Sequence, residues 1–277
     1  MKRRIRLCAS LLTLAASVAL ASDADVRDIV RRSAAAEEHN WNLARNYTFS
    51  ERTNLRHLNA EGKVESQEVT IHEITMLEGS QYRRLVAYGG RPLTAAEERK
   101  EHDKFAKTSA ERQKESASQR AQRVGDYNNR PEWQREAWRD LPEAFDFRRA
   151  ADAMWQGRQV YVIDATPRAG FQPHSRTGKA MQHLKCKLWI DKQDFNLIKA
   201  DVEAIDPIWV GLFLVRVAKG TRAGYEQMRV NDEVWLASQV QASISARLGL
   251  FKVIRLEHEA SYSKCLEYQA GALVGKR

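Results

Sequence analysis

The residues from 158 to 205 constrain the fold most strongly, because apolar and polar side chains alternate there with a period of two. The alternation predicts three strands, over 160–165, 184–191 and 198–204. In a strand, successive side chains point to opposite faces of the sheet. The polar turn at 191–194 is short, which is typical of an antiparallel hairpin. The sequence therefore predicts antiparallel strands with one buried side and one solvent-facing side.

Residues 1–21 have the pattern of a secretory signal peptide. A basic start is followed by a continuous apolar run from Leu7 to Leu20, and Ala19-Leu20-Ala21 fits an A-x-A cleavage site. The run is shorter than the roughly 20 residues that span a bilayer. We expect cleavage, a periplasmic location and no transmembrane segment in the remaining chain.

Removal of the signal also changes the charge of the protein. The whole chain has 45 basic and 36 acidic residues, a net charge of +9. The signal contains four of the basic residues, so 41 remain against 36 acids, a net charge of +5. This mild excess allows an anionic partner such as lipid head groups, and it does not indicate nucleic-acid binding.

The chain from 22 to 277 is predicted to form a single domain, with residues 94–155 as a helical insertion. Helical spacing predicts an amphipathic helix over 23–42, and long polar strands are expected over 43–88. Thr94 and Glu97 form a capping-box pattern, so a charged helix is expected from Thr94 to Val124. Short helices are expected over 132–155, and further strands complete the sheet from 225 to 262.

Motifs for catalysis or metal binding are not found. The seven histidines show no metal-ligand spacing, and no phosphate loop, dinucleotide fingerprint or G-x-S-x-G nucleophile occurs. The acids Asp191, Asp194, Asp201 and Glu203 are interpreted as surface residues. We therefore predict a protein that is not an enzyme and has no cofactor or metal. A hydrolase that uses His174 or His183 is a minor alternative.

Two cysteines, Cys186 and Cys265, remain after the signal. In an exported protein they could form one disulfide between the central and the C-terminal strands. A free buried thiol at Cys186 is equally compatible with its position on the apolar side of its strand.

Four short segments resemble a known family. They are Leu141-Pro142-Glu143-Ala144-Phe145-Asp146-Phe147, Val162-Ile163-Asp164-Ala165-Thr166-Pro167-Arg168, Leu188-Trp189-Ile190-Asp191 and Val234-Trp235-Leu236. With the signal peptide, the helix and the polar strands, the chain resembles exported bacterial proteins of unknown function with the outer-membrane lipoprotein-sorting fold (LolA-like or RseB-like). The resemblance implies a curved antiparallel sheet that forms a half-open barrel with helices, and an apolar concave face that takes up acyl chains.

We accordingly predict an α+β protein with one strongly curved antiparallel sheet and helices packed on its concave side. The leading hypothesis is non-catalytic binding or transport of a lipid, a lipoprotein acyl chain or a similar apolar ligand. The candidate residues for the apolar cavity are Leu188, Ile190, Ile198, Val202, Trp209, Phe213, Val240, Ile244 and Leu256, and core packing is the alternative role for each.

A second hypothesis assigns the protein to the interaction class. It is then an envelope sensor or scaffold that binds a protein partner through the charged helix at 94–124.

Overall fold

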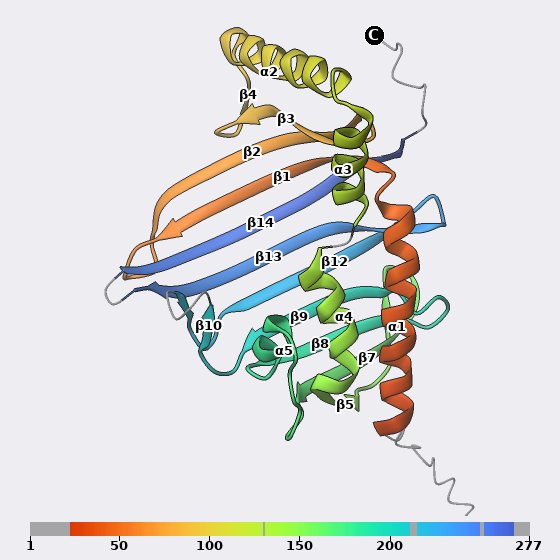
Figure 1. The fold of residues 1–277 in the computed structure, drawn as a ribbon. Coiled ribbons are helices and arrows are strands. Elements are labelled where there is room, and N and C mark those ends of the chain that lie inside the picture. Colours follow the sequence, from red (N-terminus) through yellow and green to blue (C-terminus); the bar gives the residue numbers. More distant parts are fainter. Residues whose placement is uncertain (1–22, 130, 211–214, 250–251, 269–277) are drawn as a thin grey trace, which may run out of the picture.

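A computed structural model describes residues 23–129, 131–210, 215–249 and 252–268 of the chain. Over these residues, fourteen strands form one antiparallel sheet, and the helices pack against it (Figure 1). The helices are α1 (Asp23–Ala44), α2 (Ala95–Gln113), α3 (Ala117–Asn128), α4 (Glu132–Ala144) and α5 (Arg176–Met181). This arrangement confirms the predicted α+β class.

The strands differ greatly in length, from the two residues of the fourth strand to the sixteen of the last. In chain order the first strands are β1 (Tyr47–Leu58), β2 (Val64–Leu77), β3 (Ser80–Tyr88), β4 (Arg91–Pro92), β5 (Phe145–Arg149), β6 (Ala153–Trp155) and β7 (Arg158–Pro167). The later strands are β8 (Leu184–Asp191), β9 (Leu197–Ala204), β10 (Ile208–Val210), β11 (Val215–Val217), β12 (Arg222–Val230), β13 (Val234–Leu248) and β14 (Lys252–Glu267).

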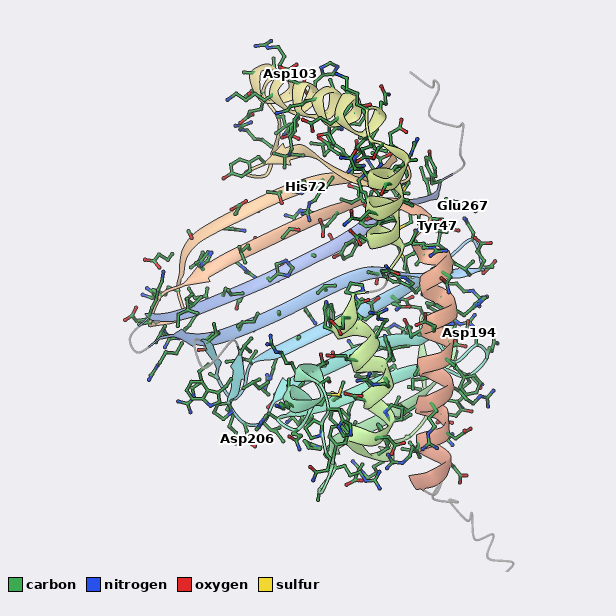
Figure 2. The ribbon with its side chains drawn as sticks, viewed as in Figure 1. Tyr47, His72, Asp103, Asp194, Asp206 and Glu267 are labelled. Atoms are coloured by element: carbon green, nitrogen blue, oxygen red, sulfur yellow. The ribbon has the colours of Figure 1, made fainter. Side chains whose placement is uncertain are left out.

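The spatial order of the strands is β4-β3-β2-β1-β14-β13-β12-β9-β8-β7-β5, with β6 beside β7, β11 beside β13 and β10 beside β11. The C-terminal strand β14 therefore lies next to the N-terminal strand β1, and Tyr47 pairs with Glu267 (Figure 2). The described sheet is open, with β4 and β5 at its two edges. Both edge strands are short, which limits pairing with other chains.

The N-terminal helix α1 packs across the strands and buries its apolar side against them. Val26, Ile29 and Val30 join Ile163 and Leu188 in one core cluster. Burial of such aliphatic side chains stabilises a fold by roughly 1.5–3 kcal/mol each. At the other end of the helix, the Asn40 side chain donates to the Trp235 carbonyl and accepts from the Trp235 N–H, both at 2.8 Å. The predicted amphipathic helix is thus confirmed, and a polar contact fixes its position along β13.

The charged segment after β4 is two helices, and it follows the edge of the sheet. The predicted capping box at Thr94 and Glu97 is present, but α2 ends at Gln113 and Ser116 caps a second helix, α3. No described residue of α2 or α3 is buried. Side chains of the segment bind the turn between β2 and β3 instead: Arg112 donates to the Leu77 carbonyl at 2.8 Å.

The expectation of helices throughout 132–155 is wrong in its second half. Helix α4 ends at Ala144, and residues 145–149 and 153–155 are the strands β5 and β6. Phe145 and Phe147 alternate with polar residues and are buried against the core. Their period-two pattern is too short to be distinguished from a helical pattern in the sequence. Pairing with β7 is what makes this segment a strand.

Candidate binding site

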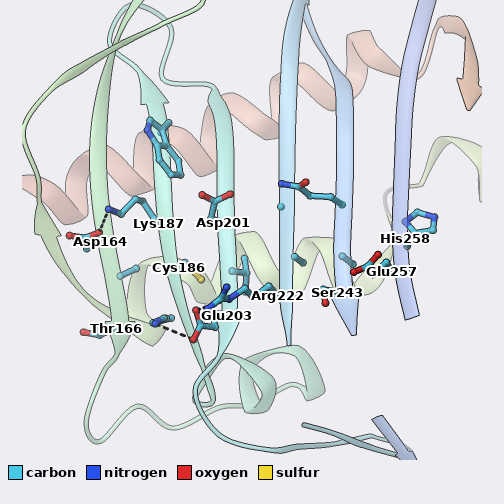
Figure 3. Close-up of a pocket in the computed structure, with 18 of the residues that line it drawn as sticks. Asp164, Thr166, Cys186, Lys187, Asp201, Glu203, Arg222, Ser243, Glu257 and His258 are labelled. Atoms are coloured by element: carbon cyan, nitrogen blue, oxygen red, sulfur yellow. Dashed lines mark hydrogen bonds and ion pairs between the residues drawn. The ribbon is translucent and has the colours of Figure 1, made fainter. Parts of the chain in front are cut away.

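A hollow of about 1130 Å³ lies on the face of the sheet that is opposite to α1 (Figure 3). Lys187 lines it, whereas the next residue, Leu188, packs in the core that contains α1. The lining residues come from eight neighbouring strands: β5, β7, β8, β9, β12, β13, β14 and β1. A flat sheet of that width would extend for about 34 Å at a strand spacing of about 4.8 Å. The hollow is therefore elongated, and it extends across most of the described sheet.

Two rows of charged side chains line the hollow, because they occupy alternate positions on paired strands. In one row Lys187 lies opposite Asp164 and Asp201, and its Nζ is 3.3 Å from an Asp164 oxygen. In the next row Lys185 lies opposite Glu203, at 3.3 Å between Nζ and the carboxylate. These pairs are drawn as dashed lines in Figure 3.

The charges in the hollow largely neutralise one another. Arg222 adds a second cation to Glu203 at 3.1 Å, and the pKa of Glu203 is lowered, mainly by its hydrogen bond to Lys185. Arg56 likewise pairs with Glu257 and Glu259, at 3.1 and 2.8 Å. The charged side chains of the hollow are therefore mostly paired with one another, and apolar residues such as Phe147, Trp189 and Val202 line it as well.

The cysteines do not form the disulfide that the sequence left open. Both Cys186 and Cys265 are free thiols. Cys186 is on β8 and Cys265 is on β14, and the strands β13, β12 and β9 lie between them. At about 4.8 Å per strand, the two backbones are far beyond the roughly 7 Å that a disulfide can bridge. Burial raises the pKa of the Cys186 thiol to about 12, so it is protonated at neutral pH and is a poor nucleophile.

Three of the predicted cavity residues lie in the core. Leu188 and Ile190 are 4% and 0% exposed, and they pack with α1. Ile198 is also 0% exposed, but it belongs to a separate cluster with Val160, Val162 and Trp235. A register shift between Trp189 and Ile190 pairs Ile190 with Leu197, and it breaks the simple alternation on β9. These three residues have a packing role.

Four of the predicted residues form a half-exposed strip on the helix-bearing face, which we call the apolar lane: Val202, Val240, Ile244 and Leu256. All four are half-buried. Val202 is two residues from Ala200, a core residue beneath α1, so both side chains point to the same face. Ala223 and Ala242 pair in register with Val202 and extend its row to β13, and all three residues also contribute to the lining of the hollow.

The lane continues on the last two long strands. Val240 and Ile244 flank Ala242 at alternate positions of β13, and Ile244 lies opposite Leu256 of β14. Because the side chains of Ala223 and Ala242 are small, they project less from the sheet than the larger side chains at the ends of the lane. Trp209, predicted near an entrance, is 54% exposed on β10. Phe213 lies outside the described residues.

The acidic turn at 191–194 is not a simple surface feature. Asp191 is 0% exposed, which corrects the surface interpretation for this residue. Arg158 donates to its carboxylate at 2.9 Å, and the N–H groups of Gln193 and Asp194 donate to the same oxygen at 2.7 and 3.1 Å. Asp191 therefore holds the β8–β9 turn together. The sequence signal for it was an Asp at the first position of a turn.

The remaining chemistry of the described residues is limited. Within them, no group of three or more His, Cys, Asp or Glu side chains could hold a metal ion. His174 is exposed and His183 is half-buried, and both lie at the ends of the segment that contains α5. None of the helices in the described part of the chain is long and apolar enough to cross a membrane.

Comparisons with known proteins find similarity to solved structures only. No protein-family model matches the sequence, and no curated protein matches it either. The chain is similar to an outer-membrane lipoprotein-sorting protein domain from Vibrio parahaemolyticus, with 11% identity, coverage of 88% of this chain and 95% of that chain, and a TM-score of 0.35. It is also similar to a LolA superfamily protein from Nitrosomonas europaea, with 8% identity, coverage of 91% and 97%, and a TM-score of 0.34.

A further likeness is to the MucA/MucB complex of Pseudomonas aeruginosa, with 11% identity, coverage of 87% of this chain and 94% of that chain, and a TM-score of 0.27. Two of these three solved structures are described as a lipoprotein-sorting domain and a LolA superfamily protein. Because the identities and TM-scores are low, the function is argued below from the residues of this chain.

Proposed function

We propose that this protein is exported to the periplasm and acts as a non-catalytic binding protein for a lipid, a lipoprotein acyl chain or a similar apolar ligand. The apolar lane on the helix-bearing face is the observation that carries this proposal. Val202, Val240, Ile244 and Leu256 come from three strands, and they leave a continuous apolar strip partly open to solvent. The basic, apolar and A-x-A pattern of residues 1–21 supports export.

The physical gain from covering the lane is hydrophobic. Each methylene of a ligand that leaves water contributes about 0.8 kcal/mol. An extended acyl chain that lies along the lane can bury several methylenes against the four side chains, and the alanines between them leave space for it. The charged hollow on the other face is less suitable for an acyl chain, since its Lys–Asp and Lys–Glu pairs would lose solvation without a new partner.

The test uses protein purified from the periplasm and two substitutions at neighbouring positions of β13. Ile244→Asp places a carboxylate in the lane, whereas Ser243→Asp places the same group on the opposite, exposed face. We expect Ile244→Asp to weaken the binding of a fluorescent fatty acid by about tenfold or more, a loss of at least about 1.4 kcal/mol. Ser243→Asp should bind as the unmodified protein does.

Lipid extraction and native mass spectrometry of the same preparations identify a co-purified ligand. Equal binding by both variants, with thermal unfolding showing that both are folded, would exclude the lane as the site. Loss of binding only in Ser243→Asp would place the ligand in the hollow instead.

A protein partner at the charged helix is the second candidate function. It is favoured by one observation: α2 has no buried residue and presents its charges to solvent. Arg99 and Lys100 are exposed on this helix, so Arg99→Glu with Lys100→Glu reverses the charge at these two positions without affecting the core. Loss of a co-purifying protein in this variant, with fatty-acid binding intact, would support the partner function over the carrier function.

A further inference from the structure

At the end of the sheet that is remote from α1, beside the β1–β2 turn with its exposed Glu61, four strand segments carry a surface made only of apolar and basic residues. We call it the tip, and it consists of 208–210 of β10, 215–217 of β11, 246–248 of β13 and 252–254 of β14. Figure 1 shows β10 beside the ends of the long strands, on the side away from α1. Of the twelve residues of the tip, nine are apolar, three are basic and none is acidic. The basic residues are Arg216, Arg247 and Lys252.

The register brings these residues together from segments that are far apart in the chain. Trp209 pairs with Arg216, Arg216 with Arg247, and Arg247 with Val253, so the four side chains form one row on one face. Trp209 is 54% exposed and Val253 is 45% exposed. The Arg216 guanidinium lies over the Trp209 ring at 5.4 Å from its centroid. A large aromatic side chain and two cations therefore face solvent side by side.

The pairing of Arg216 with Arg247 is unfavourable in the isolated protein. Like charges directly opposite each other on paired strands repel. Among the described residues, neither arginine has a carboxylate partner, and nor does Lys252. The nearest acids along the chain are Asp206, which precedes β10, and Glu257, which is paired with Arg56. An anionic surface placed against the tip would remove the repulsion.

We propose that the tip docks on a membrane surface that contains anionic lipids. Tryptophan prefers the interface between head groups and acyl chains, and arginine and lysine bind anionic head groups. The exposed valines Val210 and Val253 add apolar area that a bilayer can cover. A soluble anionic protein would bind the cations. It would not offer an apolar layer that could bury the tryptophan and the aliphatic side chains.

The tip also adjoins the apolar lane, although its row from Trp209 to Val253 lies on the other face of the sheet, because Arg247 alternates with Ala246 on β13. Ala246 of the tip follows Ile244 on the same face of β13, and Ile254 precedes Leu256 on the same face of β14. If the lane holds an acyl chain, the docked tip brings the end of the lane close to the bilayer. The docking surface itself does not rest on the lane, and its test is separate.

The experiment is vesicle flotation with the protein purified from periplasm. Vesicles of phosphatidylethanolamine with phosphatidylglycerol are compared with vesicles of phosphatidylcholine alone. We expect binding to the anionic vesicles, weakened by salt because the charges are exposed. The double variant Arg216→Gln with Arg247→Gln should lower the partition coefficient by roughly 25-fold, since each basic residue near an anionic surface contributes about fivefold. Trp209→Ser should lower it further in that variant.

The matched control is Arg99→Gln with Lys100→Gln on α2, which removes the same net charge from a different element. At about 0.1 M salt it should change the partition coefficient by less than about twofold, because charges beyond a Debye length of about 10 Å are screened there. Fatty-acid binding in solution should be unchanged in the tip variant, which separates this inference from the carrier function. Absence of binding to anionic vesicles at low salt would overturn the proposal. An equal loss in both double variants would do the same.

Discussion

Arg158 and Asp191 form an ion pair at the end of the central hairpin, and only one of them reaches solvent. Arg158 Nη2 lies 2.9 Å from Asp191 Oδ1, and Asp191 is 0% exposed whereas the Arg158 side chain is 21% exposed. Two backbone N–H groups of the turn complete the coordination of the carboxylate. Through these contacts the buried carboxylate links the start of β7 to the turn between β8 and β9.

Removal of the cation should destabilise the protein strongly. Arg158→Ala leaves the buried Asp191 without its charged partner, and we expect a loss of about 3 kcal/mol in the free energy of unfolding. Urea denaturation measures it. Arg148→Ala is the matched control, because Arg148 pairs with Asp164 at 2.8 Å but its side chain is 80% exposed. The control should lose no more than about 1 kcal/mol. Equal losses would show that the buried Arg158–Asp191 pair contributes no more to stability than an exposed ion pair does.

The same carboxylate should make the stability depend on acid pH. Burial alone would raise the pKa of Asp191, but the Arg158 guanidinium and the N–H groups of Gln193 and Asp194 outweigh it and lower the pKa. The unfolded chain then binds the proton more tightly than the folded chain does. The stability from this group is present above the unfolded pKa of about 3.9, and it is lost as the pH falls through the lower folded value.

Thermal unfolding between pH 7 and pH 3 checks this dependence. Asp191→Asn should be less stable than the unmodified protein at pH 7, and the difference should shrink towards pH 3, since the variant has no such proton to bind. A constant difference over the whole range would contradict the assignment to Asp191.

The two charged helices should detach locally when their clamp on the β2–β3 turn is removed. Arg123 donates to the Ser80 hydroxyl at 2.7 Å, to the Glu78 carbonyl at 2.9 Å and to the Glu115 carboxylate at 2.6 Å. Hydrogen bonds from charged groups contribute about 1.5–3 kcal/mol each. Arg123→Ala should therefore accelerate amide exchange in α2 and α3 by about tenfold or more, without a change in α1.

Hydrogen exchange with mass spectrometry measures the two regions in one experiment. Lys107→Ala is the control, since its ion pair with Glu111 is exposed and 4.0 Å long. Exchange in α2 and α3 that is as slow in Arg123→Ala as in this control would show that other contacts hold the helices.

Cys186 should resist alkylation in the folded protein. Its pKa is raised to about 12 by burial, so almost none of it is thiolate at pH 8. Iodoacetamide should modify Cys265 first, because its pKa is raised less by its partial burial. In denaturant both thiols should react, and mass spectrometry without reductant should find both free. A mass that shows neither thiol free would mean that a disulfide does form.

The face of each residue on β8 could be predicted from the sequence. Cys186, Leu188 and Ile190 do point to the helix-bearing face, whereas Lys185 and Lys187 line the hollow. The prediction holds because the two-residue period of a strand is a local property of the backbone. The same reasoning failed for Ile198, since a one-residue register shift on β9 depends on the pairing with β8 and leaves no mark in the sequence.

The lane and the tip likewise separate what is local in the sequence from what depends on the tertiary structure. The sequence by itself determined the three strands of the central segment and the long polar strands, the amphipathic helix at 23–42, the capping box at Thr94 and the apolar character of Val240 and Ile244. Only the tertiary structure decided that Leu188 and Ile190 are covered by α1 while Ile244 stays half-open, and that Arg216 lies opposite Arg247. Periodicity arises from bonds between neighbouring residues. Exposure and charge pairing depend on which distant strands lie next to each other. The packing energy of the whole sheet determines this strand order.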